Sequence, residues 1–78
     1  MKELKLIQDE ITGLVHVKED SQYNSINADL AILAENVKVR FFGQVGDVIL
    51  KKGSLLYVHG TVSGKVENMG GVIHVFNN

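Results

Sequence analysis

The sequence contains no cysteine and no proline, and both absences restrict how the chain is stabilised. Without cysteine, a disulfide framework and thiolate metal sites are excluded. Without proline, no strand position lacks a backbone N–H donor, so a β ladder can run without interruption. A chain of 78 residues buries only a modest fraction of its surface and usually needs further stabilisation, which leaves oligomerisation as the remaining source.

Strong charge of one sign and long apolar runs are also absent. The formal net charge is −1 and the Lys and Arg residues are scattered, so there is no basic patch for nucleic acid and no polybasic membrane anchor. No apolar run is long enough to span a bilayer, and the acidic residue within Met1–Leu6 argues against a signal peptide. We therefore expect a cytoplasmic protein that binds no nucleic acid, has no integral membrane segment and carries no cofactor.

What the sequence does contain is an alternating apolar pattern that repeats every 17 residues. Each copy opens on Asn or Gly, continues with alternating apolar residues and closes on Gly or Asn; the copies are 36–43, 53–60 and 70–77. The same register extends over the segments between them, which align as 31–36, 48–53 and 65–70. Alternation with period two indicates strands, and Gly and Asn indicate the bends between them.

This short period predicts a β-solenoid, in which each coil holds two or three short strands joined by sharp bends. One coil cannot bury its own apolar face, whereas stacked coils pair their backbones at about 4.8 Å and form a continuous core. We therefore predict an all-β fold in one domain, residues 1–78, with about three 17-residue coils over residues 26–77. A small antiparallel β-barrel built from the same strands is the alternative.

The N-terminal part is predicted to add two strands to this solenoid. Residues 3–8 alternate with period two, and residues 11–18 are typical of a second strand. The N-terminal strand pair, residues 1–18, is therefore expected to be a hairpin that packs on the coils. The polar segment 19–25 is expected to be a loop, and 28–33 a strand, because its repeat counterparts are β-branched and glycine-rich.

Stacking places equivalent residues in columns, and alternation decides which columns point inward. Two uniformly apolar columns are expected inside: Val39, Leu56 and Ile73, and then Phe41, Val58 and Val75. Three columns are expected outside: Lys38, Leu55 and Val72; Arg40, Tyr57 and His74; Phe42, His59 and Phe76. The outer columns become more apolar along the chain, which predicts that a second copy or the N-terminal hairpin covers them.

The predicted interface consists of this outer strip and the last strand. The segment Val72–Phe76 has no charged residue apart from protonated His74, and neither a capping helix nor a charged tail follows it in the sequence. An uncapped β edge is a template for pairing, so end-to-end stacking is expected. The candidate interface residues are Phe42, Leu55, Tyr57, His59, Val72, His74, Val75 and Phe76.

No constellation of residues points to catalysis, and we predict that the protein is not an enzyme. His59 and His74 fall on one face of successive coils, but no carboxylate shares their columns, so an interface role is favoured over a metal site. Ser54 and Ser63 have no His and Asp partners at a recognisable spacing. The sequence therefore predicts no catalytic residue and no metal ligand.

Two glycine-rich segments, 43–46 and 60–64, lack the Lys-Ser/Thr ending and the following helix of a phosphate loop, so we interpret their glycines as bends. With its Gly-x-Val-x-Gly-x-Val pattern at Gly60-Thr61-Val62-Ser63-Gly64-Lys65-Val66, the chain resembles the bactofilins, bacterial polymer-forming cytoskeletal proteins with a β-helix core. The resemblance covers about residues 26–77 and concerns the pattern alone. It implies nucleotide-free head-to-head or tail-to-tail polymerisation through apolar contacts of the terminal coils, and no catalytic residues.

The function predicted from the sequence is therefore that of a structural protein that assembles with itself into homo-oligomers or polymers. Within this prediction, a filament and a small closed oligomer are both open. The alternative function is a small binding module whose outer apolar strip recognises a protein, a peptide or a glycan.

Overall fold

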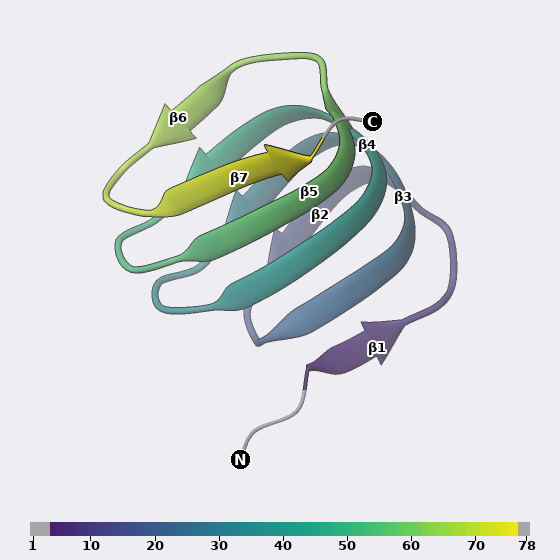
Figure 1. The fold of residues 1–78 in the computed structure, drawn as a ribbon, viewed down its shortest axis with the longest axis horizontal. Helices are drawn as coiled ribbons and strands as arrows, with labels where there is room; N and C mark the ends of the chain where they lie inside the picture. Colours follow the sequence, from purple (N-terminus) through teal and green to yellow (C-terminus); the bar gives the residue numbers. More distant parts are fainter. Residues whose placement is uncertain (1–3, 77–78) are drawn as a thin grey trace.

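The computed structural model describes residues 4–76 and shows a β-solenoid of about four turns, without a helix in this range (Figure 1). Its strands are β1 (Lys5–Ile7), β2 (Ile11–Val17), β3 (Ser21–Leu33), β4 (Lys38–Leu50), β5 (Leu55–Val62), β6 (Val66–Asn68) and β7 (Val72–Phe76). Every pair of neighbouring strands is parallel. The predicted solenoid is confirmed, and the antiparallel barrel is wrong.

The strands form two layers that enclose the core. One layer, nearer the viewer in Figure 1 and called the front layer, contains β1, the first part of β3, the first part of β4, β5 and β7 in this order. The back layer contains β2, the last part of β3, the last part of β4 and β6. Because β3 and β4 bend from the front layer into the back layer, each of these strands contributes to both layers.

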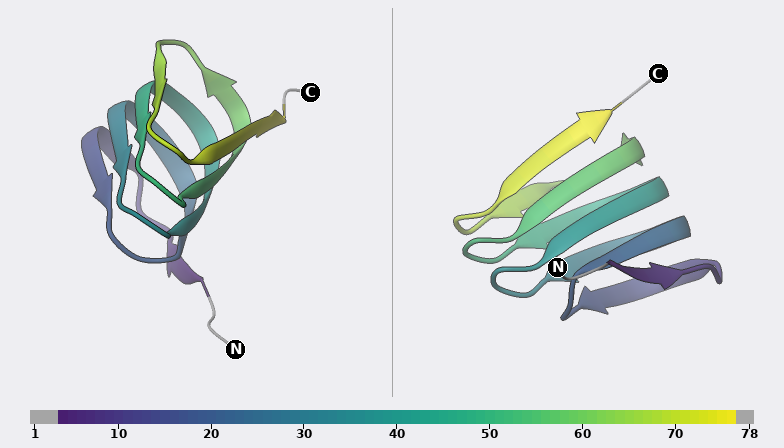
Figure 2. Two further views of the ribbon diagram at one scale, coloured as in Figure 1. Left: turned by 90° about the vertical axis from the view of Figure 1, so that its left-hand side faces the viewer. Right: turned by 60° about the horizontal axis from the view of Figure 1, so that its bottom comes forward.

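The N-terminal strands form the first turn of the solenoid, and the predicted hairpin is wrong. β1 and β2 do not pair with each other; both pair in parallel with β3, at its start and at its end. They lie at one end of the stack, while β6 and β7 lie at the other (Figure 2). This extra turn explains why about four turns are present where three were predicted.

The predicted loop over residues 19–25 is also wrong, because β3 already begins at Ser21. Ser21 is buried, and its hydroxyl donates a hydrogen bond to the Glu19 carbonyl oxygen at 2.7 Å. The neighbouring Gln22 amide bonds the Asn24 side chain at 2.9 Å on the outside. A polar strand is tolerated here because its inward polar group has a local partner.

The predicted columns are confirmed in the front layer. Val39, Leu56 and Ile73 pair directly, and so do Phe41, Val58 and Val75. In the back layer the 17-residue register slips by one, because Val48 pairs with Val66 and not with Lys65. The bend from Val62 to Val66 is one residue longer than the bend from Val45 to Val48, although Val45 and Val62 pair with each other.

The bends depend on residues with unusual backbone properties. Asn36, Gly53 and Gly70 have φ angles of 62°, 77° and 110°, a region that Gly and Asn adopt more readily than other residues. At the opposite bend Gly43 pairs with Gly60, and a Cβ atom on Gly60 would overlap the Gly43 carbonyl oxygen. The interpretation of these glycines as bends is confirmed, since close backbone contact leaves no room for a side chain.

The core lies between the two layers along the whole stack. Its largest fully buried side chains are Phe41, Leu33, Leu50 and Leu56. The Tyr23 ring packs edge-on against Phe41, with ring centroids 5.3 Å apart and an interplanar angle of 86°. Within residues 4–76, no buried side-chain nitrogen or oxygen lacks a hydrogen-bond partner. The solenoid therefore satisfies its own interior without a ligand or a metal.

Burial raises the pKa of the Tyr23 hydroxyl above its ordinary value of 10.0, more strongly than the nearby Lys5 lowers it. Because the folded-state pKa lies above the unfolded value, the stabilisation by the neutral phenol is complete below about pH 10 and is lost as the pH rises through the folded-state pKa. We expect Tyr23→Phe to reduce the fall in unfolding free energy as the pH rises above about 10, measured in urea. An unchanged fall in Tyr23→Phe would contradict this assignment.

Candidate functional site

The predicted interface residues all lie where alternation places them, seven in the outer columns and Val75 in the inner column. Seven of the eight face outward from the front layer: Phe42, Leu55, Tyr57, His59, Val72, His74 and Phe76. Val75 instead continues the inner column of Phe41 and Val58. The outer residues pair in the predicted register, so the predicted strip is a real surface of the fold.

The rings of Phe42, His59 and Phe76, called here the aromatic ladder, stack along the solenoid axis. The Phe42 and His59 centroids are 4.7 Å apart at 8°, and the His59 and Phe76 centroids are 4.8 Å apart at 15°. These distances match the spacing of paired strands, about 4.8 Å, because parallel in-register pairing places each ring directly over the next. In the neighbouring column Tyr57 and His74 stack in the same way, at 5.4 Å and 16°.

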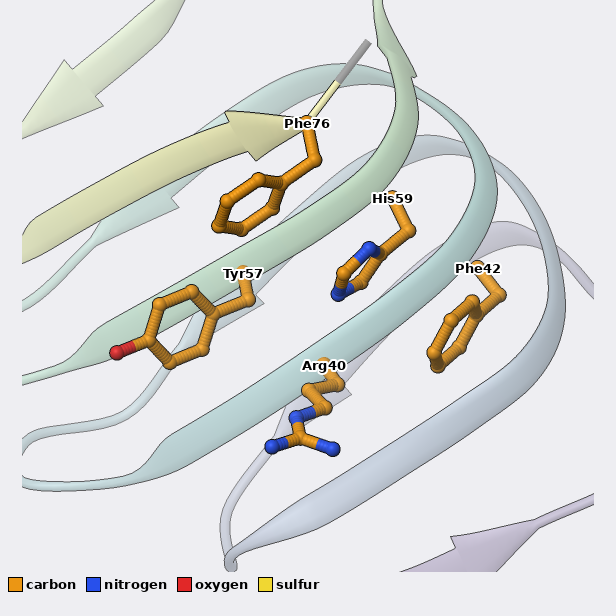
Figure 3. A pocket seen from close by; sticks show the side chains of 5 residues that line it. All are labelled: Arg40, Phe42, Tyr57, His59 and Phe76. Atoms are coloured by element: carbon orange, nitrogen blue, oxygen red, sulfur yellow. The ribbon is translucent and has the colours of Figure 1, made fainter. Parts of the chain in front are cut away.

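A pocket of ≈ 380 Å³ lies between the aromatic ladder and the neighbouring outer column (Figure 3). Its lining residues come from β4, β5 and β7 and are Arg40, Phe42, Tyr57, His59 and Phe76. Because the ladder rings stack face to face, they turn their edges, not their faces, toward the adjacent column. An aromatic ring carries partial positive charge at its edge, so these edges favour electron-rich groups.

The charges on the outside of the front layer also favour electron-rich groups. Its outward residues on β4, β5 and β7 include Lys38, Arg40, His59 and His74 but no acidic residue. Within residues 4–76 the ion pair present is Lys5–Glu19, at 3.2 Å, and Arg40 takes no part in one. The carboxylate of Asp20, in the turn before β3, accepts a hydrogen bond from the Lys38 backbone N–H at 2.9 Å. The Arg40 guanidinium is therefore exposed in the pocket wall, and none of the carboxylates in the described part of the chain pairs with it.

The predicted covering of this face by the N-terminal strands is not observed, because both strands belong to the first turn. Among the described N-terminal residues, Leu4 lies beside β4 and β5. It lines a second pocket of ≈ 240 Å³ with Lys38, Val39, Arg40 and Tyr57. The ladder and its pocket remain exposed beside it. A third pocket, of ≈ 250 Å³ and lined in part by Lys5, lies near the first turn.

The C-terminal end of the solenoid is open in the part of the chain that the structure describes. β7 pairs with β5 alone, and β6 with β4 alone. In the inner column Val58 is fully buried, whereas Val75, one turn further, is 45% exposed. Further apolar side chains exposed on this last turn are Val66, Met69, Val72 and Phe76. The interior of the solenoid is thus accessible at this end.

Sequence reasoning missed an apolar strip outside the back layer. Leu14 on β2 is 65% exposed and pairs with Leu30, and Ile32 pairs with Ile49 in the next column. The alternation within β3 and β4 contained the signal, but inner and outer columns were distinguished only within the repeats 36–43, 53–60 and 70–77. Together with exposed Leu6 on β1, Leu14 makes the first turn partly apolar as well.

The two histidines of the front layer take part in ring stacking. His59 and His74 stack on other aromatic rings, and residues 4–76 contain no group of three His, Asp or Glu side chains placed to hold a metal ion. None of the described segments forms a helix of the length and apolarity needed to cross a membrane.

No protein-family model matches the chain, and no curated protein or solved structure is detectably similar to it.

Proposed function

We propose that this protein is a structural, self-assembling protein that forms homo-oligomers or polymers through the open C-terminal turn of its solenoid. The observation that carries the proposal is the contrast within one inner column. Val58 is fully buried beneath the last turn, whereas Val75, which has the same inward position, is 45% exposed because no further turn lies over it. An additional β layer on β7 would complete this column.

The backbone of the last turn favours the same contact. Within residues 4–76, β7 has a strand neighbour on one side only, so N–H and C=O groups on its other side are unpaired by the chain itself. Such an edge is a template for a strand from another molecule. β7 carries no Lys, Arg, Asp or Glu, the residues that commonly prevent edge-to-edge pairing.

A second copy of the chain is the partner that fits this edge best. Successive turns of the solenoid already pair with one another in parallel and with their columns in register, so a turn of a second copy can pair in the same way. The first turn of a second copy would present the open edges of β1 and β2 to the contact, giving head-to-tail growth. Two C-terminal turns meeting about a two-fold axis would give a closed dimer, and this tail-to-tail contact is one of the two that the bactofilin-like pattern implies.

Light scattering and analytical ultracentrifugation of the 78-residue chain test the proposal. We expect a mass above that of the monomer which rises with concentration, and a reduction of the association constant by at least about tenfold in Val75→Lys and in Phe76→Lys. Both changes place a cation in the contact, but the lysine can extend to solvent in the monomer, so folding should persist. Gln44→Lys, at an exposed position of the opposite bend, is the matched control for added charge.

The outcomes separate the possibilities. A monomer at every concentration would refute assembly. Assembly that survives both terminal substitutions would place the contact elsewhere, on the apolar strip of the back layer or on the aromatic ladder. Growth without limit means that both ends of the solenoid associate, whereas a mass that stops at the dimer means that contact occurs at one end alone.

A further inference from the structure

We infer that the pocket between the aromatic ladder and Arg40 is a binding site for a small planar aromatic anion, that is, an aromatic ring carrying one carboxylate, sulfonate or phosphate group. This site is independent of the assembly contact, because most of its lining lies on β4 and β5 and not on the last turn. Phe76 is the residue that belongs to both surfaces.

The size of the pocket suits a ligand of one or two rings. Its volume of ≈ 380 Å³ lies in the lower part of the range for small-molecule sites, roughly 300 to 1,000 Å³. Four aromatic side chains and one cation line it, which is a largely apolar wall with one group to fix orientation. The pocket opens to solvent on the front face, so a ligand can reach it without any change in the fold (Figure 3).

Ring geometry selects the aromatic part of the ligand. Phe42 and His59 already occupy each other's faces, at 4.7 Å, so the surfaces left for a ligand are their edges. A planar aromatic ligand that lies in the pocket with its π face toward these edges would make edge-to-face contacts, which are a preferred geometry of aromatic pairs. Aliphatic ligands lack that complementarity.

Charge selects the anionic part. The Arg40 guanidinium lies in the wall and forms no ion pair with any of residues 4–76, and the outer columns of β4, β5 and β7 contain no carboxylate. Guanidinium presents a planar fork of N–H donors that matches the oxygens of a carboxylate, sulfonate or phosphate. A cationic ligand of the same shape would instead be repelled, so the sign of the charge distinguishes this site from a merely apolar surface.

The scaffold holds the site in place before a ligand arrives. The lining residues alternate with Phe41 and Val58, which are fully buried in the core, so the backbone under the pocket is fixed. Stacking within each column further restricts the rings. A site on rigid strands loses little conformational entropy on binding.

Two-dimensional ¹H–¹⁵N NMR titration with naphthalene-2-carboxylate, at a pH where the histidines are neutral, tests the inference. We expect shifts centred on residues 40–42 and 57–59, and at least tenfold weaker binding of the matched cation 2-naphthylmethylammonium. Arg40→Gln should weaken binding of the carboxylate at least tenfold. Lys38→Gln, which removes the same charge two residues earlier on the same strand but outside this pocket, should change it less than twofold.

Phe42→Leu serves as a second variant, since it keeps an apolar side chain but removes a ring edge, and it should weaken binding severalfold. Equal affinity for the anion and the cation would overturn the inference. So would equal effects of Arg40→Gln and Lys38→Gln, or shifts confined to the last turn. The mass of Arg40→Gln measured by light scattering should match that of the parent. Loss of ligand binding can therefore be distinguished from loss of assembly.

Discussion

Replacing Gly60 by alanine is expected to prevent the chain from folding, with a loss of unfolding free energy above about 4 kcal/mol. The new Cβ atom would overlap the Gly43 carbonyl oxygen, which belongs to the strand paired with β5. The backbone cannot give way locally, because moving β5 off β4 breaks the ladder on both sides of the bend. Circular dichroism and ¹H–¹⁵N spectra of the variant should show an unfolded chain.

Gly13→Ala is the matched control for this result. Gly13 also has a positive φ, 75°, but no atom lies within 4 Å of the position of its Cβ. We therefore expect only the conformational cost of a side chain in this region, about 1–2 kcal/mol, and a folded protein. If Gly60→Ala were as stable as Gly13→Ala, close backbone contact at this bend would not be what requires glycine.

Replacing Phe41 by alanine is expected to lower the unfolding free energy by about 3–5 kcal/mol. Phe41 is fully buried and contacts Tyr23 edge-on, so the variant loses the transfer free energy of the ring and leaves a cavity between the layers. For a chain of this length that loss is comparable with the whole stability, roughly 4–12 kcal/mol at 0.05–0.15 kcal/mol per residue. Urea unfolding monitored by circular dichroism measures it.

Phe76→Ala makes the same deletion at a ring that is 45% exposed on the last turn. At a dilution where the chain is monomeric, we expect less than half the loss seen for Phe41→Ala. A similar loss at both positions would mean that the last turn contributes as much to stability as the closed part of the core, contrary to the exposure of Val75 and Phe76.

The sequence allowed the front layer to be predicted in detail from β4 through β5 to β7, because there the repeat length is constant. Leu56 lies 17 residues from both Val39 and Ile73, and both pairs form. The first turn could not be found in this way, since Lys5 pairs with Ser21 after 16 residues and Ser21 with Val39 after 18. A bulge between Tyr23 and Ile26 absorbs the difference, and a fixed period cannot reveal such a shift.

For the candidate site, the sequence predicted the positions of the residues but not the arrangement of their side chains. Alternation placed Phe42, His59 and Phe76 in one outer column, but the stacking of their rings depends on side-chain rotamers that a pattern does not specify. Arg40 was placed in an outer column, but no role was predicted for it. The signal for the role proposed here was present in the sequence, because no Asp or Glu occupies the outer columns around Arg40.

The nearly constant offset between paired strands also determines how the chain folds. Each turn touches only the turns before and after it, so a contact anywhere in the stack closes a loop of one turn and never one of the whole chain. Pairing the first two turns costs loop-closure entropy before a core has formed to offset it. Each later turn packs on an existing core, so its free-energy cost is smaller and is similar from one turn to the next. Folding should thus begin with one costly nucleus around β3 and β4 and then proceed like the growth of a one-dimensional crystal, whose rate per turn does not depend on how many turns are already in place.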